Sequence, residues 1–188
     1  MATQDILQKL KGGHDEFINL SDKLYYKTAL QEMAVTPKWW EEYGNELNGI
    51  PFNWQKIKYT ELRKELNGDP SLGNGTGVYL FVIEPSFKLV SLPGFVFYVG
   101  IAGENDSKRH LRVRLKEYIQ YSNIKKRDKV ITALELYHKE TYVYFSKLNV
   151  TTKKLSEIES WLHGFYMPWA NERDYPAKIK KARKSWGK

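Results

Sequence analysis

The pattern of apolar and polar residues predicts a short sheet in the middle of the chain. Val78–Ile83 and Phe95–Val99 are apolar at successive positions, which predicts strands that are central in a sheet and covered on both faces. Thr141–Leu148 alternates between apolar and polar residues and is predicted as a third strand. Before residue 70 the pattern indicates mostly helix and loop. The helical segments expected there are Gln4–Lys11, Asp15–Met33 and Tyr59–Leu66.

Three segments after the second strand have helical spacing. Leu111–Tyr121 gathers its apolar side chains on one stripe, and Asp128–His138 and Thr152–Met167 are predicted as further helices. The order strand, strand, helix, helix, strand, helix is typical of a small α/β sandwich around a short sheet. Asn67–Thr76 is rich in Gly, Asn and Pro and leads into a strand, so we expect a linker rather than a phosphate-binding loop.

Composition excludes several kinds of site. The 188 residues include no cysteine, which rules out disulfides, a catalytic thiol and any zinc site with thiolate ligands. The N-terminus lacks the basic and then apolar layout of a signal peptide, and no apolar run approaches the ~18 residues of a membrane span. We therefore expect a soluble, cytoplasmic protein without a membrane partner.

The formal net charge of +8 is unevenly distributed. Arg173–Lys188 holds seven Lys or Arg and one Asp, and Glu104–Lys129 holds nine basic and four acidic residues. The rest of the chain is therefore net negative. Two explanations stay open, a solvated helix face with a basic tail or a surface that binds nucleic acid.

Two charged side chains lie beside predicted apolar stripes. Glu159 falls at the edge of the stripe of the last helix, so its carboxylate is partly desolvated and needs a cation or a proton, whereas Glu157 points to solvent. Arg114 flanks the stripe of the first helix, with Tyr118 one turn further along. A guanidinium there either clamps a phosphate or pairs with an acid such as Glu117 on the surface.

These residues occur in an order that resembles the GIY-YIG nuclease family. The resemblance covers about residues 76–171, which would make residues 1–70 a helical N-terminal extension and residues 172–188 a basic C-terminal tail. The matching elements are Gly77-Val78-Tyr79, Tyr98-Val99-Gly100, Arg114-Leu115-Lys116-Glu117-Tyr118, and Glu159 with Pro168 and Asn171.

The resemblance implies an α+β fold with a small three-stranded antiparallel sheet flanked by helices. It implies an enzyme that hydrolyses phosphodiester bonds of DNA with one Mg²⁺ or Mn²⁺ and no small-molecule cofactor. Glu159 would hold the metal, Arg114 would bind the scissile phosphate, and Tyr79 and Tyr98 would line the attack site, with Tyr79 favoured as the base. Asn171 would mainly fasten the chain behind the last helix. The residues expected on the substrate side are Tyr118, Lys108, Arg109 and Asn171.

The chain departs from the family pattern at three places. Valine replaces the central isoleucine of both tyrosine motifs, which keeps the branching. Ile101 stands where the family often has a lysine, so a basic helper would come from Lys108 or Arg109. The connection between the tyrosines is long, and Pro85–Pro93 is interpreted as an inserted loop.

Three functions stay open at this point. Site-specific DNA cleavage, of the restriction or mobile-element type, is the first choice, and a palindromic target would suggest a homodimer. A repair or structure-specific nicking nuclease is the second choice. A DNA-binding module that keeps the fold without the chemistry is the third, because Ile101 replaces a lysine and the tail is basic.

Overall fold

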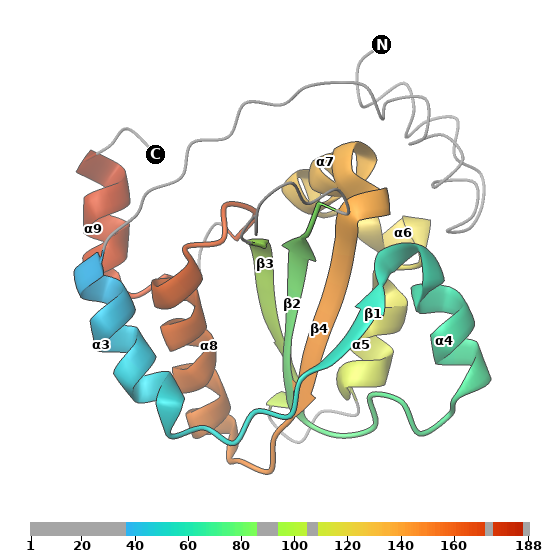
Figure 1. Cartoon of the computed structure of the whole chain (residues 1–188), viewed down its shortest axis with the longest axis horizontal. Helices are drawn as coiled ribbons and strands as arrows, with labels where there is room; N and C mark the ends of the chain where they lie inside the picture. Colours follow the sequence, from blue (N-terminus) through green and yellow to red (C-terminus); the bar gives the residue numbers. More distant parts are fainter. Residues whose placement is uncertain (1–36, 86–93, 105–108, 172–174, 186–188) are drawn as a thin grey trace.

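The computed structural model describes residues 37–85, 94–104, 109–171 and 175–185 (Figure 1). The helices predicted at Gln4–Lys11 and Asp15–Met33, residues 86–93 of the predicted insertion, and Lys108 lie outside these ranges. The described elements are α3 (Pro37–Asn48), β1 (Gln55–Lys58), the 3₁₀ helix η2 (Tyr59–Glu61), α4 (Leu62–Gly68), β2 (Gly77–Ile83), β3 (Phe95–Ala102), α5 (Leu111–Glu117), α6 (Tyr121–Ile124), α7 (Asp128–Tyr137), the 3₁₀ helix η4 (His138–Glu140), β4 (Thr141–Lys147), α8 (Thr152–Tyr166) and α9 (Ala177–Ser185).

The sheet has four antiparallel strands in the order β1-β4-β2-β3, which confirms the α+β class but not the expected count of three. The additional strand is β1, from the segment predicted as helix and loop. Its sequence, Gln-Lys-Ile-Lys, has one apolar residue, Ile57, which lies opposite Val143 of β4. A four-residue strand with so little apolar content gives no periodic signal, and pairing with β4 decides its conformation.

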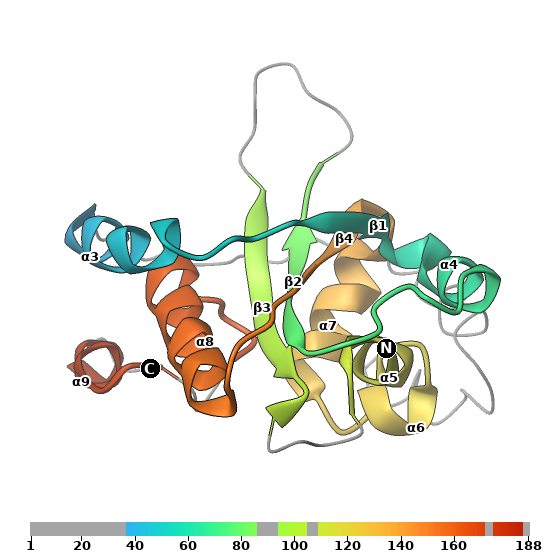
Figure 2. The ribbon, with the colours of Figure 1, turned by 90° about the horizontal axis from the view of Figure 1, so that it is seen from below.

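Strand β2 is central, as predicted, and all seven of its residues are buried. Alternate side chains enter two different cores, since successive residues of a strand point to opposite faces. Val78 and Leu80 pack with residues of α8, whereas Tyr79 and Phe81 pack with residues of α5 and α7. Figure 2 shows α8 on one side of the sheet and α5 and α7 on the other.

Strand β3 lies at an edge of the sheet, so its predicted central position was wrong. The segment after α8 covers its outer edge: the N–H of Ala170 donates to the carbonyl of Phe97 at 2.9 Å. The Asn171 amide then accepts from the Val99 N–H and donates to the Val99 carbonyl, both at 2.8 Å. Apolar residues on both faces show that a strand is covered, but they do not show which strands flank it.

The predicted linker is held against α5 by Arg112. Its guanidinium donates to the carbonyl oxygens of Leu66, Asp69 and Leu72, the last two at 2.6 and 3.3 Å. Gly73 has φ +70°, and a side chain there would press against the backbone of Arg112. These contacts fix α4 relative to α5, which carries candidate site residues.

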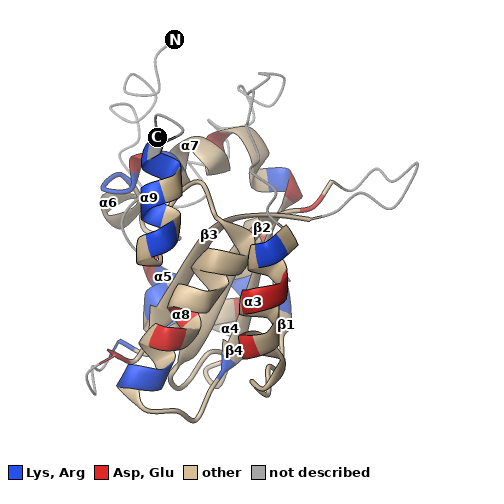
Figure 3. Ribbon diagram, turned by 90° about the vertical axis from the view of Figure 1, so that its left-hand side faces the viewer, with Lys and Arg blue, Asp and Glu red and all other residues tan. Residues whose placement is uncertain are grey.

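The basic C-terminal segment forms a helix rather than only a tail. Helix α9 docks through Ile179, which is fully buried with Tyr43 of α3 and Tyr175. Lys180, Lys181 and Lys184 of α9 are exposed. Figure 3 shows that Lys and Arg occur along much of this helix. In the described ranges, no helix combines the length and apolar character that crossing a membrane requires.

Candidate functional site

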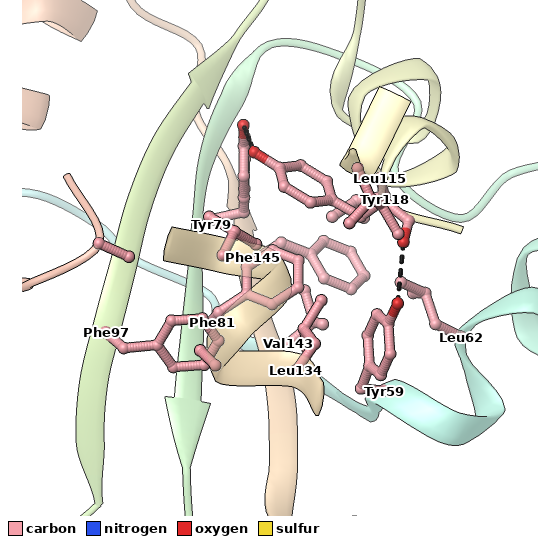
Figure 4. Close-up of a cluster of buried hydrophobic side chains, with 14 of the residues drawn as sticks. Tyr59, Leu62, Tyr79, Phe81, Phe97, Leu115, Tyr118, Leu134, Val143 and Phe145 are labelled. Atoms are coloured by element: carbon pink, nitrogen blue, oxygen red, sulfur yellow. Dashed lines mark hydrogen bonds between the residues drawn. The ribbon is translucent and has the colours of Figure 1, made fainter. Parts of the chain in front are cut away.

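Three tyrosine rings meet on the face of the sheet that α5 and α7 cover. Tyr79 comes from β2, Tyr98 from β3 and Tyr118 from the end of α5. Their ring centroids are 6.2 Å apart for Tyr79 and Tyr98, 5.6 Å for Tyr79 and Tyr118, and 5.8 Å for Tyr98 and Tyr118. The hydroxyls of Tyr79 and Tyr118 share a hydrogen bond of 3.0 Å (Figure 4). Residues 39 positions apart in the sequence are thus joined directly.

The glycine next to each motif tyrosine is required for space. Gly100 lies opposite Tyr79 in the β2–β3 register, and a Cβ there would be 2.9 Å from Cε2 of Tyr79 and closer still to its hydroxyl. A Cβ at Gly77 would be 2.8 Å from Leu111 and closer still to the carbonyl oxygen of Ser146. Ordinary side-chain contacts are not this short, so both positions exclude a side chain.

A β-bulge turns Tyr98 toward the other tyrosines. Phe81 pairs with Tyr98, but Val82 pairs with Val96, which leaves Phe97 as an extra residue in β3. An extra residue changes the face to which the following side chains point. Phe97 and Tyr98 therefore both pack on Phe81, with centroid distances of 5.8 and 6.1 Å.

Arg127, which the sequence analysis did not single out, connects two of the tyrosines. Its Nη1 donates to the hydroxyl of Tyr98 at 3.0 Å and to the hydroxyl of Tyr118, and its guanidinium lies 4.5 Å from the Tyr118 ring centre. Nη2 lies 3.3 Å from Oε2 of Glu117. The available signal was the basic run Lys125-Lys126-Arg127 directly before α7, within the stretch of high positive charge.

Glu117 is shared by three guanidinium groups. Arg114 lies 3.5 Å from it and 3.4 Å from Glu104, and Arg109 donates to it from Nε at 3.1 Å and from Nη2. The surface pairing of Arg114 with Glu117, which the sequence left open, is therefore present. Among the described residues of these ion pairs, three guanidiniums face two carboxylates, which is an excess of one positive charge. We call Tyr79, Tyr98, Tyr118, Arg114, Arg127 and Glu117 the tyrosine–arginine cluster.

Burial separates the three phenols chemically. Tyr79 and Tyr118 are 1% and 0% exposed, and desolvation raises the pKa of both above the ordinary value near 10. Tyr98 is half-buried and lines a surface pocket. Burial lowers the pKa of the Arg114 guanidinium, but Tyr79, Glu104 and Glu117 together raise it by more, so the pKa lies above its ordinary value. The two buried phenols thus stay neutral and Arg114 stays charged.

Of the other predicted site residues, Arg109 contacts the cluster through Glu117, whereas Glu159 and Asn171 belong to other segments. Glu159 is half-buried on α8, the helix of the opposite face, and Asn171 is 4% exposed with its amide bonded to β3. This contact is the fastening role that the resemblance implies. Arg109 is 53% exposed and pairs with Glu117. Glu157 is a surface acid, as expected, 3.6 Å from Lys154.

A metal ion would depend on few protein ligands. The described residues contain no group of three or more His, Cys, Asp or Glu that could hold one. Mg²⁺ commonly keeps several waters and takes one or two carboxylates together with phosphates of the substrate, so a single carboxylate fits its chemistry. Glu104 and Glu117 pair with arginines. The resemblance implies Glu159 as the carboxylate that would hold the ion.

A pocket of about 290 Å³ opens beside Tyr98. Its lining is mainly basic and polar, and we call it the basic pocket. The lining residues are Tyr98, Lys126, Arg127, Asp128, Lys129, Val130 and Ala170.

Comparisons of this chain with protein-family models, curated proteins and solved structures give no match.

Proposed function

We propose that this protein is a metal-dependent DNA endonuclease that hydrolyses phosphodiester bonds, with a site of the GIY-YIG kind. The observation that carries the proposal is the convergence of Tyr79, Tyr98 and Arg114 from three elements into one cluster. The glycines of both motifs occupy positions that admit no side chain. Packing of the phenols does not call for the two charged arginines beside them, whereas a phosphate is a ligand that suits both.

Arg114 is suited to bind the scissile phosphate. Its present partners are 3.4 and 3.5 Å away, which is long compared with the ~2.7–2.9 Å of a strong charge-assisted hydrogen bond. Exchanging these partners for a phosphate therefore costs little. A guanidinium can donate two parallel hydrogen bonds to phosphate oxygens, and it stabilises the charge that develops there in the transition state.

The two motif tyrosines have different roles in this proposal. The sequence favoured Tyr79 as the base, but its burial opposes formation of a phenolate. Tyr98 borders the surface and accepts a hydrogen bond from Arg127. We therefore assign Tyr98 to orient the attacking water, and Tyr79 to hold Tyr118 and, through it, Arg127 in place.

Glu159 would hold Mg²⁺ or Mn²⁺. When bound, such an ion neutralises charge on the phosphate and makes a bound water more acidic. Glu159 and the tyrosine–arginine cluster belong to opposite faces of the sheet, so a substrate that meets both must bridge the two sides of edge strand β3.

Cleavage of plasmid DNA tests the reaction. Supercoiled and linear DNA are incubated with Mg²⁺ or Mn²⁺ and with the wild-type protein, Glu159→Gln or Arg114→Ala. The control variant is Glu157→Gln, which changes a surface acid on the same helix. The proposal predicts that the first two variants lose cleavage by at least 100-fold, within the range expected for a lost electrostatic stabiliser. Wild-type activity in both variants would refute the proposed site.

The biological role follows from how the protein selects its target. Site-specific cleavage is our first choice, with a homodimer if the target is palindromic, and a repair or structure-specific nick is the second. Mapping the cut ends on a long DNA of random sequence separates the two. Cuts that recur at one sequence support the first role, and cuts that follow DNA structure support the second.

A DNA-binding module without cleavage is the second candidate function. Two observations favour it: Ile101 replaces the lysine of the family pattern, and the C-terminal segment is strongly basic. This candidate predicts tight, salt-sensitive binding of DNA with no cleavage under any divalent metal.

A further inference from the structure

The basic pocket lies next to the proposed site, but the resemblance assigns none of its residues except Tyr98. It carries three basic side chains, Lys126, Arg127 and Lys129, and one acid, Asp128. Val130 and Ala170 supply an apolar part of its wall. The excess of positive charge indicates an anionic ligand, and about 290 Å³ is close to the lower limit, roughly 300 Å³, of ordinary ligand pockets.

Arg127 reaches both the pocket and the proposed site. Three of its hydrogen bonds go to Tyr98, Tyr118 and Glu117, and its side chain is 24% exposed. A guanidinium has five N–H donors, so Arg127 can bind an anion from its exposed side while it keeps these partners. Lys126 is exposed and belongs to no ion pair within the part of the chain that the structure describes.

We propose that the basic pocket binds a phosphate of the DNA backbone beside the scissile one, with Arg127 positioning the Tyr98 phenol from the same guanidinium. The inference rests on the proposed function, since Arg114 is taken to bind the scissile phosphate. The inference also offers a cation in place of the lysine that Ile101 replaces. The sequence suggested Lys108 or Arg109 for this role, whereas Arg127 directly contacts a motif tyrosine.

A backbone phosphate suits the pocket better than a free nucleotide. The pocket shares Arg127 with the tyrosine–arginine cluster, so a chain of consecutive phosphates can occupy both places. Its lining offers basic side chains for a phosphate and one aromatic ring, that of Tyr98, which the cluster already packs against Tyr118. A base would have no second ring to stack on among these residues.

The salt dependence of DNA binding tests the phosphate contact without using catalysis. A short fluorescent duplex is titrated in EDTA at several salt concentrations with wild type, Lys126→Ala/Lys129→Ala and Lys125→Ala. Lys125 is an exposed neighbour outside the pocket lining, and its single replacement serves as the control for loss of a nearby surface charge. We expect the slope of log K against log salt to fall by about 0.9 for one lost phosphate contact in the double variant only.

A direct probe tests the pocket itself. Inorganic phosphate is titrated into the full chain while NMR follows the backbone amides of residues 126–130 and the ring of Tyr98. The proposal predicts saturable shifts at both places in wild type and smaller shifts in Arg127→Lys, which keeps the charge but not the planar fork. Equal shifts in Arg127→Met would overturn the role of Arg127. If a free nucleotide binds more tightly than duplex DNA compared at the same concentration of phosphate groups, the ligand is a nucleotide and the proposal is wrong.

The two proposals fail in different ways. If Arg114→Ala and Glu159→Gln keep full cleavage, the nuclease site is wrong, but the slopes in EDTA still report on the pocket. If those variants lose cleavage while Lys126→Ala/Lys129→Ala binds DNA with the wild-type slope, the pocket inference alone is refuted. It is also refuted if Lys125→Ala lowers the slope equally, because the effect is then general surface charge.

Discussion

Replacing Asn171 with alanine removes the side chain that fastens the edge of the sheet. The Asn171 amide makes two hydrogen bonds of 2.8 Å to the backbone of Val99, 72 residues earlier in the chain. Val99 lies between Tyr98 and Gly100 of the second tyrosine motif. The amide thus takes the place that another strand would have, and it holds the motif from outside.

The expected cost follows from the groups left without partners. Val99 is fully buried, so in Asn171→Ala its N–H and carbonyl lose their partners away from solvent. Each unsatisfied buried group costs about 1–3 kcal/mol, and the two together about 2–6 kcal/mol. Typical domains have a free energy of unfolding of about 5–15 kcal/mol, so the loss is a large part of the total.

Urea unfolding followed by tryptophan fluorescence measures this loss. The matched control is Asn74→Ala, whose side chain donates one exposed hydrogen bond of 3.0 Å to the carbonyl of Pro70. We expect the control to change the free energy of unfolding by less than about 0.5 kcal/mol. If Asn171→Ala is no more destabilising than the control, the amide does not hold β3 and the reasoning fails.

Four other results are expected. Gly100→Ala should cost about 1–3 kcal/mol, and much less when Tyr79 is also truncated to alanine, as a double-mutant cycle of unfolding free energies would measure. Burial raises the folded-state pKa of Tyr79 and Tyr118. Their contribution to stability is therefore complete below the unfolded-state pKa of about 10 and is lost as pH rises above it. The urea midpoint, measured between pH 8 and 11, should fall less steeply with pH in Tyr79→Phe than in wild type. Replacing Lys180 and Lys181 with glutamine should weaken binding of all DNA sequences alike while thermal stability stays unchanged, because Ile179 still docks α9; unchanged affinity would make α9 only a solubilising end. EDTA should stop cleavage and leave DNA binding measurable, and cleavage that persists in EDTA would exclude the metal.

Strong local signals made several elements predictable. The continuous apolar run of β2 predicted its burial correctly, because the side chains that pack are neighbours on one strand. On α8 the stripe residues Leu155, Ile158 and Leu162 are buried as expected, but Tyr166, expected on the same stripe, is exposed. Arg114 was also placed correctly at the flank of its stripe, and it is part of the cluster. Its ion pair with Glu117, left open from the sequence, lies within one helix.

Long-range pairing was not predictable in the same way. Strand β1 has no periodic signal of its own and exists because β4 offers it hydrogen-bonding partners. The edge position of β3 depends on the segment that carries Asn171, far away in the sequence. An apolar pattern records how much of a strand is covered, and it does not record which segment covers it.

The residue types and their order supply the available chemistry: two tyrosine motifs, an arginine beside a helical stripe, a carboxylate on α8, and no thiol. Which of these groups meet depends on the fold. It buried Tyr79, left Tyr98 at the surface and brought Arg127 to it from 29 residues away. Residue type and spacing set local conformation, whereas desolvation and ion pairing depend on the packing of distant segments.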